Sequence, residues 1–399
     1  MLISQAMIPL TLFFSAFLLA SAGLNAAADE PGRRAVSGRR TGKVATADSD
    51  ATPAAEARAV GATGIQNTPI VIAHRGASGY LPEHTLESAA LAHGMNVDYI
   101  EQDVVLSRDN VPLVLHDVTL NDVTDVAVRF PDRRRANGLW YVMDFDLAEL
   151  KSLTVTERRS EKRAWKDAGT RFPLEKGAFR ICTLQEQLTL IQGLNQSRQT
   201  SIGIYVELKD PDLHHKAGRD IATVVLKVLD DFGYRSAKDP VFLQCFDEKE
   251  VRRLRLELDC SLPIIQLLSK APEPARLQEI AKYADGLGIP LTQVVSGADA
   301  NGNPAVTDIV RRAHEHAMQV HVWTFRTDAM PAFAPDAETL LNWLVKDGGV
   351  DGIFSDQPDV VCRWRNRQQP ETASRGPFRL LNQKSVDRPE EPQTDAGDN

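Results

Sequence analysis

Short apolar runs alternate with amphipathic stretches between about residues 66 and 365. Nine of these runs are short and bounded by turn-forming residues, which predicts strands. Between most of them the apolar positions recur with a helical period, as at Val225, Val228 and Leu229. Strands that alternate with helices favour parallel βα units. The predicted strands are residues 70–74, 99–105, 112–116, 202–208, 241–246, 263–268, 286–289, 320–325 and 352–355.

One connection in this series is too short for a helix. The second and third predicted strands are joined by a turn around Asp109 and Asn110. Parallel neighbours need a crossover of about a dozen residues, whereas a hairpin needs only a tight turn. We therefore expect residues 112–116 to fold back on residues 99–105, with His116 opposite Asp103. The remaining eight strands predict an α/β fold of the (β/α)8 TIM-barrel type, spanning residues 66–365.

Residues 118–181 do not continue the alternation of strands and helices. They are polar and mixed, which predicts an inserted subdomain near the active-site mouth of the barrel. The insertion contains Arg133, Arg134 and Arg135 in succession. This basic cluster either steers an anionic substrate toward the mouth or forms a solvated surface.

The two ends of the chain differ in composition from the barrel. Residues 7–19 are almost wholly apolar and are followed by small residues, so we expect residues 1–28 to be a signal peptide, despite the lack of a preceding basic residue. The alternative is an uncleaved anchor, although the run is short for a membrane span. Residues 29–65 read as a flexible linker and residues 366–399 as a disordered tail. The expected location is periplasmic or secreted, with no stable membrane insertion after cleavage.

The overall composition limits the kinds of binding partner and the kinds of cysteine chemistry that can be expected. The 399-residue chain has 43% hydrophobic and 25% charged residues, as in an ordinary globular protein, and a formal net charge of −8. An acidic chain is poorly suited to nucleic acid, so no such partner is expected. The four cysteines show no CxxC pattern, which argues against a thiolate metal site and leaves open either one disulfide or buried free thiols.

Three carboxylates stand late in predicted strands. Glu101 and Asp103 are two residues apart, so their side chains project from the same face of an extended strand. Glu207 occupies a similar place in residues 202–208. In a parallel barrel the carboxyl ends of the strands meet at the active face. Oxygen ligands of this kind suit a divalent cation, with Ca²⁺ the first candidate and Mg²⁺ the alternative.

Two histidines and two cations accompany these carboxylates. His74 ends the first predicted strand and His116 ends the predicted hairpin arm. Because imidazole titrates near neutral pH, the pair could exchange protons with attacking and leaving oxygens. Arg75 and Lys209 carry fixed positive charge that suits a phosphodiester anion. The same two side chains could instead form salt bridges with the carboxylates, and the two arrangements can coexist.

These residues fall within motifs that resemble those of a known family. Residues 74–85, which read HRGASGYLPEHT, resemble the opening signature of glycerophosphodiester phosphodiesterases, and the histidine at 84 resembles the periplasmic bacterial type. The further motifs follow in the same order at residues 101–103, 115–117, 206–209, 243–247 and 354–358. The resemblance covers nearly all of residues 69–362.

The resemblance implies a (β/α)8 barrel and a metal-dependent phosphoric diester hydrolase. Such an enzyme converts a small-molecule glycerophosphodiester to sn-glycerol 3-phosphate and an alcohol, by way of a cyclic phosphate formed by the glycerol 2-hydroxyl. It implies that His74 and His116 are the catalytic acid/base pair. The other roles that it implies are cation binding by Glu101, Asp103 and Glu207, phosphate binding by Arg75 and Lys209, and further substrate contacts by Gln244, Trp323 and Phe325.

Two other functions remain open at this stage. A phospholipase of the same barrel type would act on intact lipid and would need an apolar rim beside the mouth, for which the sequence offers no clear apolar loop. A binding protein could keep the barrel and lack turnover, although both histidines and all three acids are retained. We expect no metal role for the remaining histidine pairs, His214 with His215 and His314 with His316.

Overall fold

The computed structural model describes residues 68–159 and 171–368. The predicted signal peptide at 1–28 and linker at 29–65 lie outside these ranges, as does the predicted tail from residue 369 onward. The last helix, Pro358–Gln368, continues beyond the predicted end of the barrel at residue 365. Among the described residues, no helix combines the length and the apolar character needed to cross a membrane.

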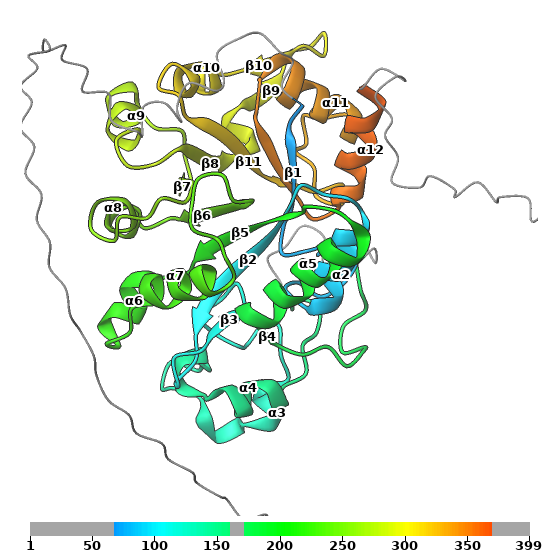
Figure 1. The fold of residues 1–399 in the computed structure, drawn as a ribbon. Helices are drawn as coiled ribbons and strands as arrows, with labels where there is room; N and C mark the ends of the chain where they lie inside the picture. The colour runs from blue at the N-terminus through cyan, green and yellow to red at the C-terminus, as the bar shows by residue number, and fades with distance from the viewer. Residues whose placement is uncertain (1–67, 160–170, 369–399) are drawn as a thin grey trace, which may run out of the picture. The chain divides into compact units, whose positions relative to one another are not determined.

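Eight parallel strands close into a barrel, which confirms the predicted fold (Figure 1). Each strand pairs with its neighbour in the order β1-β2-β5-β6-β7-β8-β11-β12, and β12 pairs with β1. The nearly continuous apolar character of these strands fits a sheet that is covered on both faces. The barrel strands are β1 (Ile70–Ala73), β2 (Tyr99–Leu106), β5 (Gly203–Leu208), β6 (Val241–Cys245), β7 (Ile264–Leu267), β8 (Gly286–Pro290), β11 (Gln319–Phe325) and β12 (Gly352–Ser355).

Helices follow most of the strands and surround the barrel (Figure 1). Their ends are set by local capping: Asp220 accepts a hydrogen bond from Thr223 N, and Asp247 from Lys249 N. Asp247 is thus the N-cap of the helix that follows β6. These outer helices are α2 (Leu86–Gly94), α5 (Leu184–Arg198), α6 (Pro211–Lys216), α7 (Ile221–Asp231), α8 (Glu248–Leu256), α9 (Pro274–Ile280), α10 (Ile309–His314), α11 (Ala337–Asn342) with its π-helical extension η5 (Trp343–Asp347), and α12 (Pro358–Gln368).

The predicted hairpin forms, but its register differs by one residue. β3 (Pro112–Val114) runs antiparallel to β2 and pairs Val104 with Val114. Leu115, not His116, therefore stands opposite Asp103, and Leu115 N donates to Asp103 O at 2.8 Å. The turn contains three residues and ends at Asn110 with φ 63°, a left-handed position that asparagine tolerates. The register prediction was wrong because it assumed a two-residue turn.

The insertion continues the sheet and has a small core of its own. β4 (Cys182–Thr183) pairs antiparallel with β3, and this short strand was not predicted. Side chains such as Leu120, Phe145 and Leu150 are fully buried in this core together with Leu113 of β3. In Figure 1 the insertion helices lie beside β3 and β4, on one side of the barrel. The insertion holds α3 (Val126–Arg129), η2 (Pro131–Arg133), η3 (Val142–Asp144) and α4 (Leu147–Ser152).

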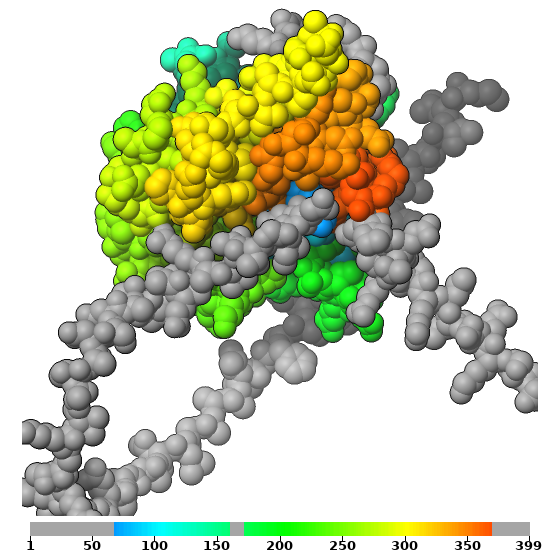
Figure 2. Space-filling model, turned by 90° about the horizontal axis from the view of Figure 1, so that it is seen from above, coloured from blue at the N-terminus to red at the C-terminus, as the bar shows by residue number. Residues whose placement is uncertain are grey.

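A second unpredicted feature follows β8. The short turn η4 (Leu291–Gln293) leads into an antiparallel pair of strands, β9 (Val295–Ala298) and β10 (Pro304–Val306). Figure 2 shows the yellow and orange segments that follow β8 gathered on one face of the molecule. These segments are too short and too polar to show a strand pattern in the sequence. In the structure, Val306 and most of the turn between the two strands are exposed.

Two apolar layers hold the barrel. The larger lies between the strands and the helices and includes Val71, Val206 and Val322. The smaller fills the inside of the barrel with Ile72, Tyr205, Ile265 and Phe354, all nearly or fully buried. The Tyr205 hydroxyl lies 2.8 Å from His321 Nδ1 within this inner layer. The four cysteines are buried free thiols, so no disulfide contributes.

Candidate active site

The carboxyl ends of β1, β2 and β5 bring the predicted acidic residues together. Glu101 and Asp103 stand two residues apart on β2, and Asp103 pairs directly with Glu207 of β5 in the parallel register. Ligand oxygens of the three side chains lie within 4.8 Å of one another. The structure thus gathers Glu101, Asp103 and Glu207 at one end of the barrel, as the sequence predicts.

The carboxylate trio is buried and short of neutralising charge. The three residues are 3%, 1% and 5% exposed. Burial and the neighbouring carboxylates raise the pKa of Glu101 well above its usual range, and burial raises the pKa of Glu207 to about 8 despite Lys209. Asp103 Oδ1 is buried without a hydrogen-bond partner. Three convergent oxygens that repel one another and include an unpaired acceptor fit a hard divalent cation.

Arg75 and Lys209 lie against these carboxylates. Arg75 N donates to Glu101 Oε2 at 3.0 Å, and Arg75 Nε lies 3.5 Å from Asp103 Oδ2. Lys209 Nζ lies 2.7 Å from Glu207 Oε1 and 3.6 Å from Asp103 Oδ1. The salt bridges considered from the sequence are therefore present. They also leave two cations beside the cluster, where an anionic substrate would be attracted.

His74 directly follows β1 and is held by a residue from the other end of the chain. Its Nδ1 lies 2.6 Å from Asp356 Oδ1, and its Nε2 lies 3.7 Å from Glu101 Oε2. Burial and the charge of Arg75 lower the pKa of His74 to about 3. The imidazole is therefore neutral at neutral pH and turns one nitrogen toward the carboxylate trio.

His116 flanks the trio from the other side. Its Nδ1 lies 2.5 Å from Asp117 Oδ1. Burial and Arg75 lower the pKa of His116 to about 4, although the nearby Asp103 carboxylate acts in the opposite direction. Both histidines therefore stand at the predicted site, although the hairpin register that delivers His116 differs from the predicted one.

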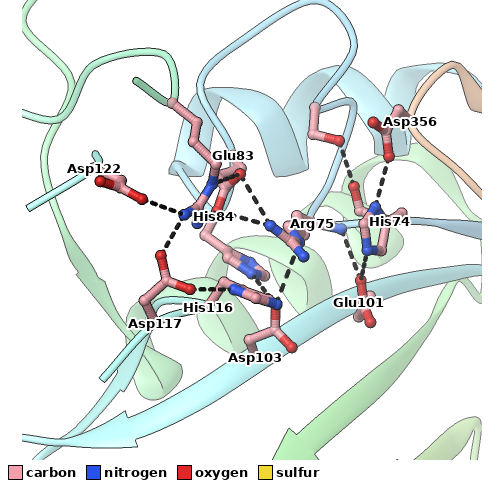
Figure 3. A network of polar contacts seen from close by, with 12 residues as sticks. His74, Arg75, Glu83, His84, Glu101, Asp103, His116, Asp117, Asp122 and Asp356 are labelled. Carbon is pink, nitrogen blue, oxygen red and sulfur yellow. Dashed lines mark hydrogen bonds and ion pairs between the residues drawn. The ribbon is translucent and has the colours of Figure 1, made fainter. Parts of the chain in front are cut away.

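Several polar residues for which the sequence predicted no catalytic or binding role surround this site (Figure 3). His84 Nε2 lies 2.7 Å from Asp103 Oδ2, and Glu83 accepts from Arg75 NH1 at 3.1 Å. Asp117 and Asp356 belong to the motifs at 115–117 and 354–358, so the motifs could have identified them. Arg158 and Arg171 come from the polar insertion, where no sequence signal distinguishes them from other arginines.

The three lesser substrate contacts suggested by the sequence have different outcomes. Gln244 is buried and donates to Glu101 Oε1 at 2.8 Å, so it orients a carboxylate. Trp323 packs with the inner layer and meets the exposed ring of Phe246 edge-on, with centroids 5.9 Å apart. Phe325 is fully buried in the layer between strands and helices. The structure therefore does not bring Phe325 together with Trp323, because a shift in strand register between Val322 and Phe325 breaks the alternation of faces.

A second group of metal-ligating side chains has a structural explanation. Oxygens and a ring nitrogen of His215, Asp220 and Glu250 also converge. Asp220 caps α7, and Arg253 binds both Asp220 and Glu250. A guanidinium group already lies against both carboxylates of this cluster.

Comparison with known proteins identifies the class as a (β/α)8-barrel phosphodiester hydrolase. The profile of the glycerophosphoryl diester phosphodiesterase family matches residues 74–360, and the chain belongs to this family. It is 40% identical over 328 residues to a glycerophosphodiester phosphodiesterase of Haemophilus influenzae, covering 75% of this chain and 90% of the relative. It is 35% identical over 330 residues to one of Treponema pallidum, covering 75% and 93%. These similarities establish the enzyme as a glycerophosphodiester phosphodiesterase.

Solved structures share the fold at lower sequence identity. A glycerophosphoryl diester phosphodiesterase of Silicibacter pomeroyi matches with a TM-score of 0.58 and 24% identity, over 76% of this chain and 95% of that one. A phosphodiesterase of Oleispira antarctica, solved with the product sn-glycerol-3-phosphate, matches with a TM-score of 0.51 and 23% identity, over 75% and 97%.

Proposed function

We propose that this enzyme hydrolyses glycerophosphodiesters to sn-glycerol 3-phosphate and an alcohol with a divalent cation and two catalytic histidines. The observation that carries the proposal is the meeting of three buried carboxylates with His74 and His116 on opposite flanks. The product bound to the Oleispira antarctica phosphodiesterase supports the same product class.

Glu101, Asp103 and Glu207 hold the cation, with Ca²⁺ the first candidate and Mg²⁺ the alternative. A bound cation would neutralise phosphate oxygens and favour the ionised form of a nearby hydroxyl. Gln244 and the Arg75 backbone N–H each fix one oxygen of Glu101. Arg75 and Lys209 bind the phosphodiester anion, since both cations already border the trio.

The two histidines move the protons. A neutral imidazole serves as the base for the glycerol 2-hydroxyl, which attacks phosphorus and forms the cyclic phosphate. A histidine that has gained a proton serves as the acid for the departing alcohol oxygen. The arriving anion offsets the charge of Arg75, which otherwise lowers the pKa of both rings. Water then opens the cyclic phosphate with the roles reversed.

The test is hydrolysis of glycerophosphocholine, followed by enzymatic detection of sn-glycerol 3-phosphate. We expect turnover that a chelator abolishes and that Ca²⁺ or Mg²⁺ restores. The matched pair of variants is Glu207→Gln, which should lose the response to the cation, and Glu250→Gln in the second cluster, which should keep it. Absence of turnover with any headgroup and any divalent ion would favour the binding-protein alternative. Hydrolysis of intact phospholipid alone would favour the lipase.

The cyclic route has its own test. A substrate analogue without the glycerol 2-hydroxyl lacks the nucleophile and should bind without being hydrolysed. Release of the alcohol from this analogue at the normal rate would mean that water attacks phosphorus directly.

We also propose export to the periplasm or the medium, because the apolar run at 7–19 and the small residues after it fit a cleaved signal. N-terminal sequencing of the mature protein from fractionated cells tests this, and an intact residue 1 in the cytoplasmic fraction would contradict it.

A further inference from the structure

The two candidate catalytic histidines are anchored in the same way. His74 Nδ1 lies 2.6 Å from Asp356 Oδ1, and His116 Nδ1 lies 2.5 Å from Asp117 Oδ1 (Figure 3). An ionised carboxylate can only accept a hydrogen bond, so each aspartate requires a proton on Nδ1. The remaining nitrogen, Nε2, is then the one free to exchange a proton with substrate. Each aspartate thus sets both the tautomer and the orientation of its ring.

The second oxygen of each aspartate is held by an arginine from the insertion. Arg158 NH1 binds Asp117 Oδ2, and Arg171 NH2 binds Asp356 Oδ2 at 2.6 Å. The two arginines are 13 residues apart in the sequence (171 − 158). Two arginines that are close in the sequence therefore support both histidines, each through an aspartate.

Both guanidinium groups are buried in ion pairs. The Arg158 side chain is 3% exposed and the Arg171 side chain 7%. Burial opposes ionisation of the two aspartates, but these ion pairs and the histidine contacts hold the pKa of Asp117 and of Asp356 below the usual range. Without the arginines, a buried aspartate would more readily take up a proton and would cease to orient its imidazole.

The two anchors differ in how many cations support them. Asp356 Oδ2 also accepts from Arg326 Nε at 2.7 Å. In the part of the chain that the structure describes, Arg158 is the arginine that binds Asp117. Arg158 Nε also donates to Glu83 at 2.9 Å, and Glu83 in turn binds Arg75. Loss of Arg158 should therefore disturb the site more than loss of Arg171.

We propose that Arg158 and Arg171 are positioning residues that act through Asp117 and Asp356, so that the insertion sets the orientation of both histidines. The proposal rests on the proposed roles of His74 and His116. It gives the insertion a part in turnover in addition to its own core. A role limited to folding would lower the melting temperature and leave kcat of the folded fraction unchanged.

Steady-state kinetics of Arg158→Met with glycerophosphocholine is the first test. We expect kcat to fall about 10–100-fold, as is common when a partner that orients a functional side chain is removed, with KM changed much less. Arg158→Lys keeps the charge and should recover part of kcat. The matched control is Arg159→Met, because Arg159 binds Thr124 O away from the histidines and should keep normal kcat. An Arg158→Met enzyme with kcat within about twofold of the parent would refute the proposal, since the predicted loss is at least tenfold.

A double-mutant cycle identifies the path of the effect. If Arg158 acts through Asp117, Arg158→Met should lower kcat far less in an Asp117→Asn background than in the parent. Losses that multiply fully would show that Arg158 acts by another route, such as Glu83. The same cycle with Arg171→Met and Asp356→Asn should show a smaller first loss, because Arg326 remains. Arg180→Met, which removes contacts to Leu153 and Thr154, is the control for this end.

A spectroscopic measurement tests the positioning without requiring turnover. Short Nδ1–H contacts to carboxylates give far-downfield proton resonances, and we expect two, assigned by their loss in His74→Ala and His116→Ala. Arg158→Met should shift or broaden the His116 signal, and Arg171→Met the His74 signal. Unchanged resonances in both folded arginine variants would overturn the inference. If the parent enzyme hydrolyses no glycerophosphodiester, the proposed function fails, and these resonances still decide whether the arginines orient the rings. Should Arg158→Met not fold, Arg158→Lys is measured in the same way, and an unchanged signal and kcat would count against the proposal.

Discussion

The two histidines flank the same three carboxylates, but the molecule holds them by different means. His74 follows β1 and its partner Asp356 follows the adjacent β12, so the closed barrel places both. His116 and Asp117 are consecutive residues beyond the antiparallel β3, outside the barrel. The His116 side chain is 27% exposed, whereas that of His74 is 11% exposed. The barrel itself therefore places one of the two proposed acid/base groups, whereas the other is placed by the hairpin strand β3, which lies outside the barrel.

Among the changes that test this comparison, removal of either imidazole should have the largest effect on kcat. We expect His74→Ala and His116→Ala to remain folded and to lower kcat by about 10²–10⁴-fold, the usual contribution of a general acid or base. Added imidazole should restore more activity to His116→Ala, because that position is more open to solvent. His316→Ala, at a half-buried position beyond α10, is the control. Near-normal kcat in either variant would remove that histidine from the acid/base pair, and equal rescue would contradict the difference in access.

Asp356→Asn and Asp117→Asn each remove the carboxylate charge that anchors one histidine, and the two variants should differ in stability. Asp356→Asn removes the buried carboxylate charge that Arg171 and Arg326 both bind and should lower the free energy of unfolding by about 3–5 kcal/mol. Asp117→Asn acts at a more exposed position and should lower it by about 1–3 kcal/mol. Urea denaturation measures both. A larger loss for Asp117→Asn would reverse the assignment of the barrel flank as the more deeply anchored one.

The glycine of the His74 loop gives a smaller and purely steric test. Gly76 has φ 81°, and a Cβ there would stand 2.6 Å from Ser88 Oγ and 2.9 Å from the Ser88 carbonyl carbon. Gly76→Ala should lower the free energy of unfolding by about 2–4 kcal/mol, from the left-handed backbone and the overlap together. Gly138 in the insertion has a similar φ of 83° with nothing near its Cβ position, so Gly138→Ala isolates the backbone part. Equal losses in the two variants would mean that the loop relaxes around the added methyl group.

The smallest effect concerns Glu157, whose carboxylate interacts with Glu83 on the His116 side and with Asp356 on the His74 side. Burial raises the pKa of Glu157 to about 7. The folded state therefore holds this proton more tightly than the unfolded chain does, so stability falls as pH rises from about 4.5 to 7. Above pH 7, Glu157→Gln should have a free energy of unfolding higher than that of the parent by on the order of 1–3 kcal/mol. Near pH 4 the two free energies should differ little. Melting curves across pH measure this, with the exposed Glu175→Gln as control. Parallel curves for parent and Glu157→Gln would show that the carboxyl titrates normally.

The sequence predicts the side of the site that the barrel forms, with His74, better than the side that the hairpin forms, with His116. The reason is physical. Strand parity alone puts Glu101 and Asp103 on one face, and the parallel architecture brings Glu207 beside them. The same parity fails where a strand is irregular: Trp323 faces the inner layer and Phe325 the outer one. The hairpin register depended on whether the turn had two residues or three, which Asn110 decides through its backbone conformation.

The roles of the two supporting arginines could not be predicted from the sequence, for a different reason. Arg158 and Arg171 are placed by tertiary contacts, with Glu83 and Asp328 respectively, and not by any period in the sequence. Asp117 and Asp356, by contrast, stand inside recognisable motifs. The motifs do not show that each aspartate binds a histidine through one oxygen and an arginine through the other. Pairwise contacts over long separations in the sequence are the kind of information that local patterns omit.

The filled interior of the barrel also restricts how molecules can come and go. Tyr205 stands two residues before Glu207 on the same face of β5 and, with its hydroxyl against His321, closes the floor beneath the carboxylates. With this inner layer packed beneath them, the carboxylates are reached from the mouth of the barrel. In the proposed two-step route, the alcohol has to leave before a water molecule can take its place at phosphorus. The rate of the second step would therefore depend on the size of the alcohol and on how tightly the site binds it.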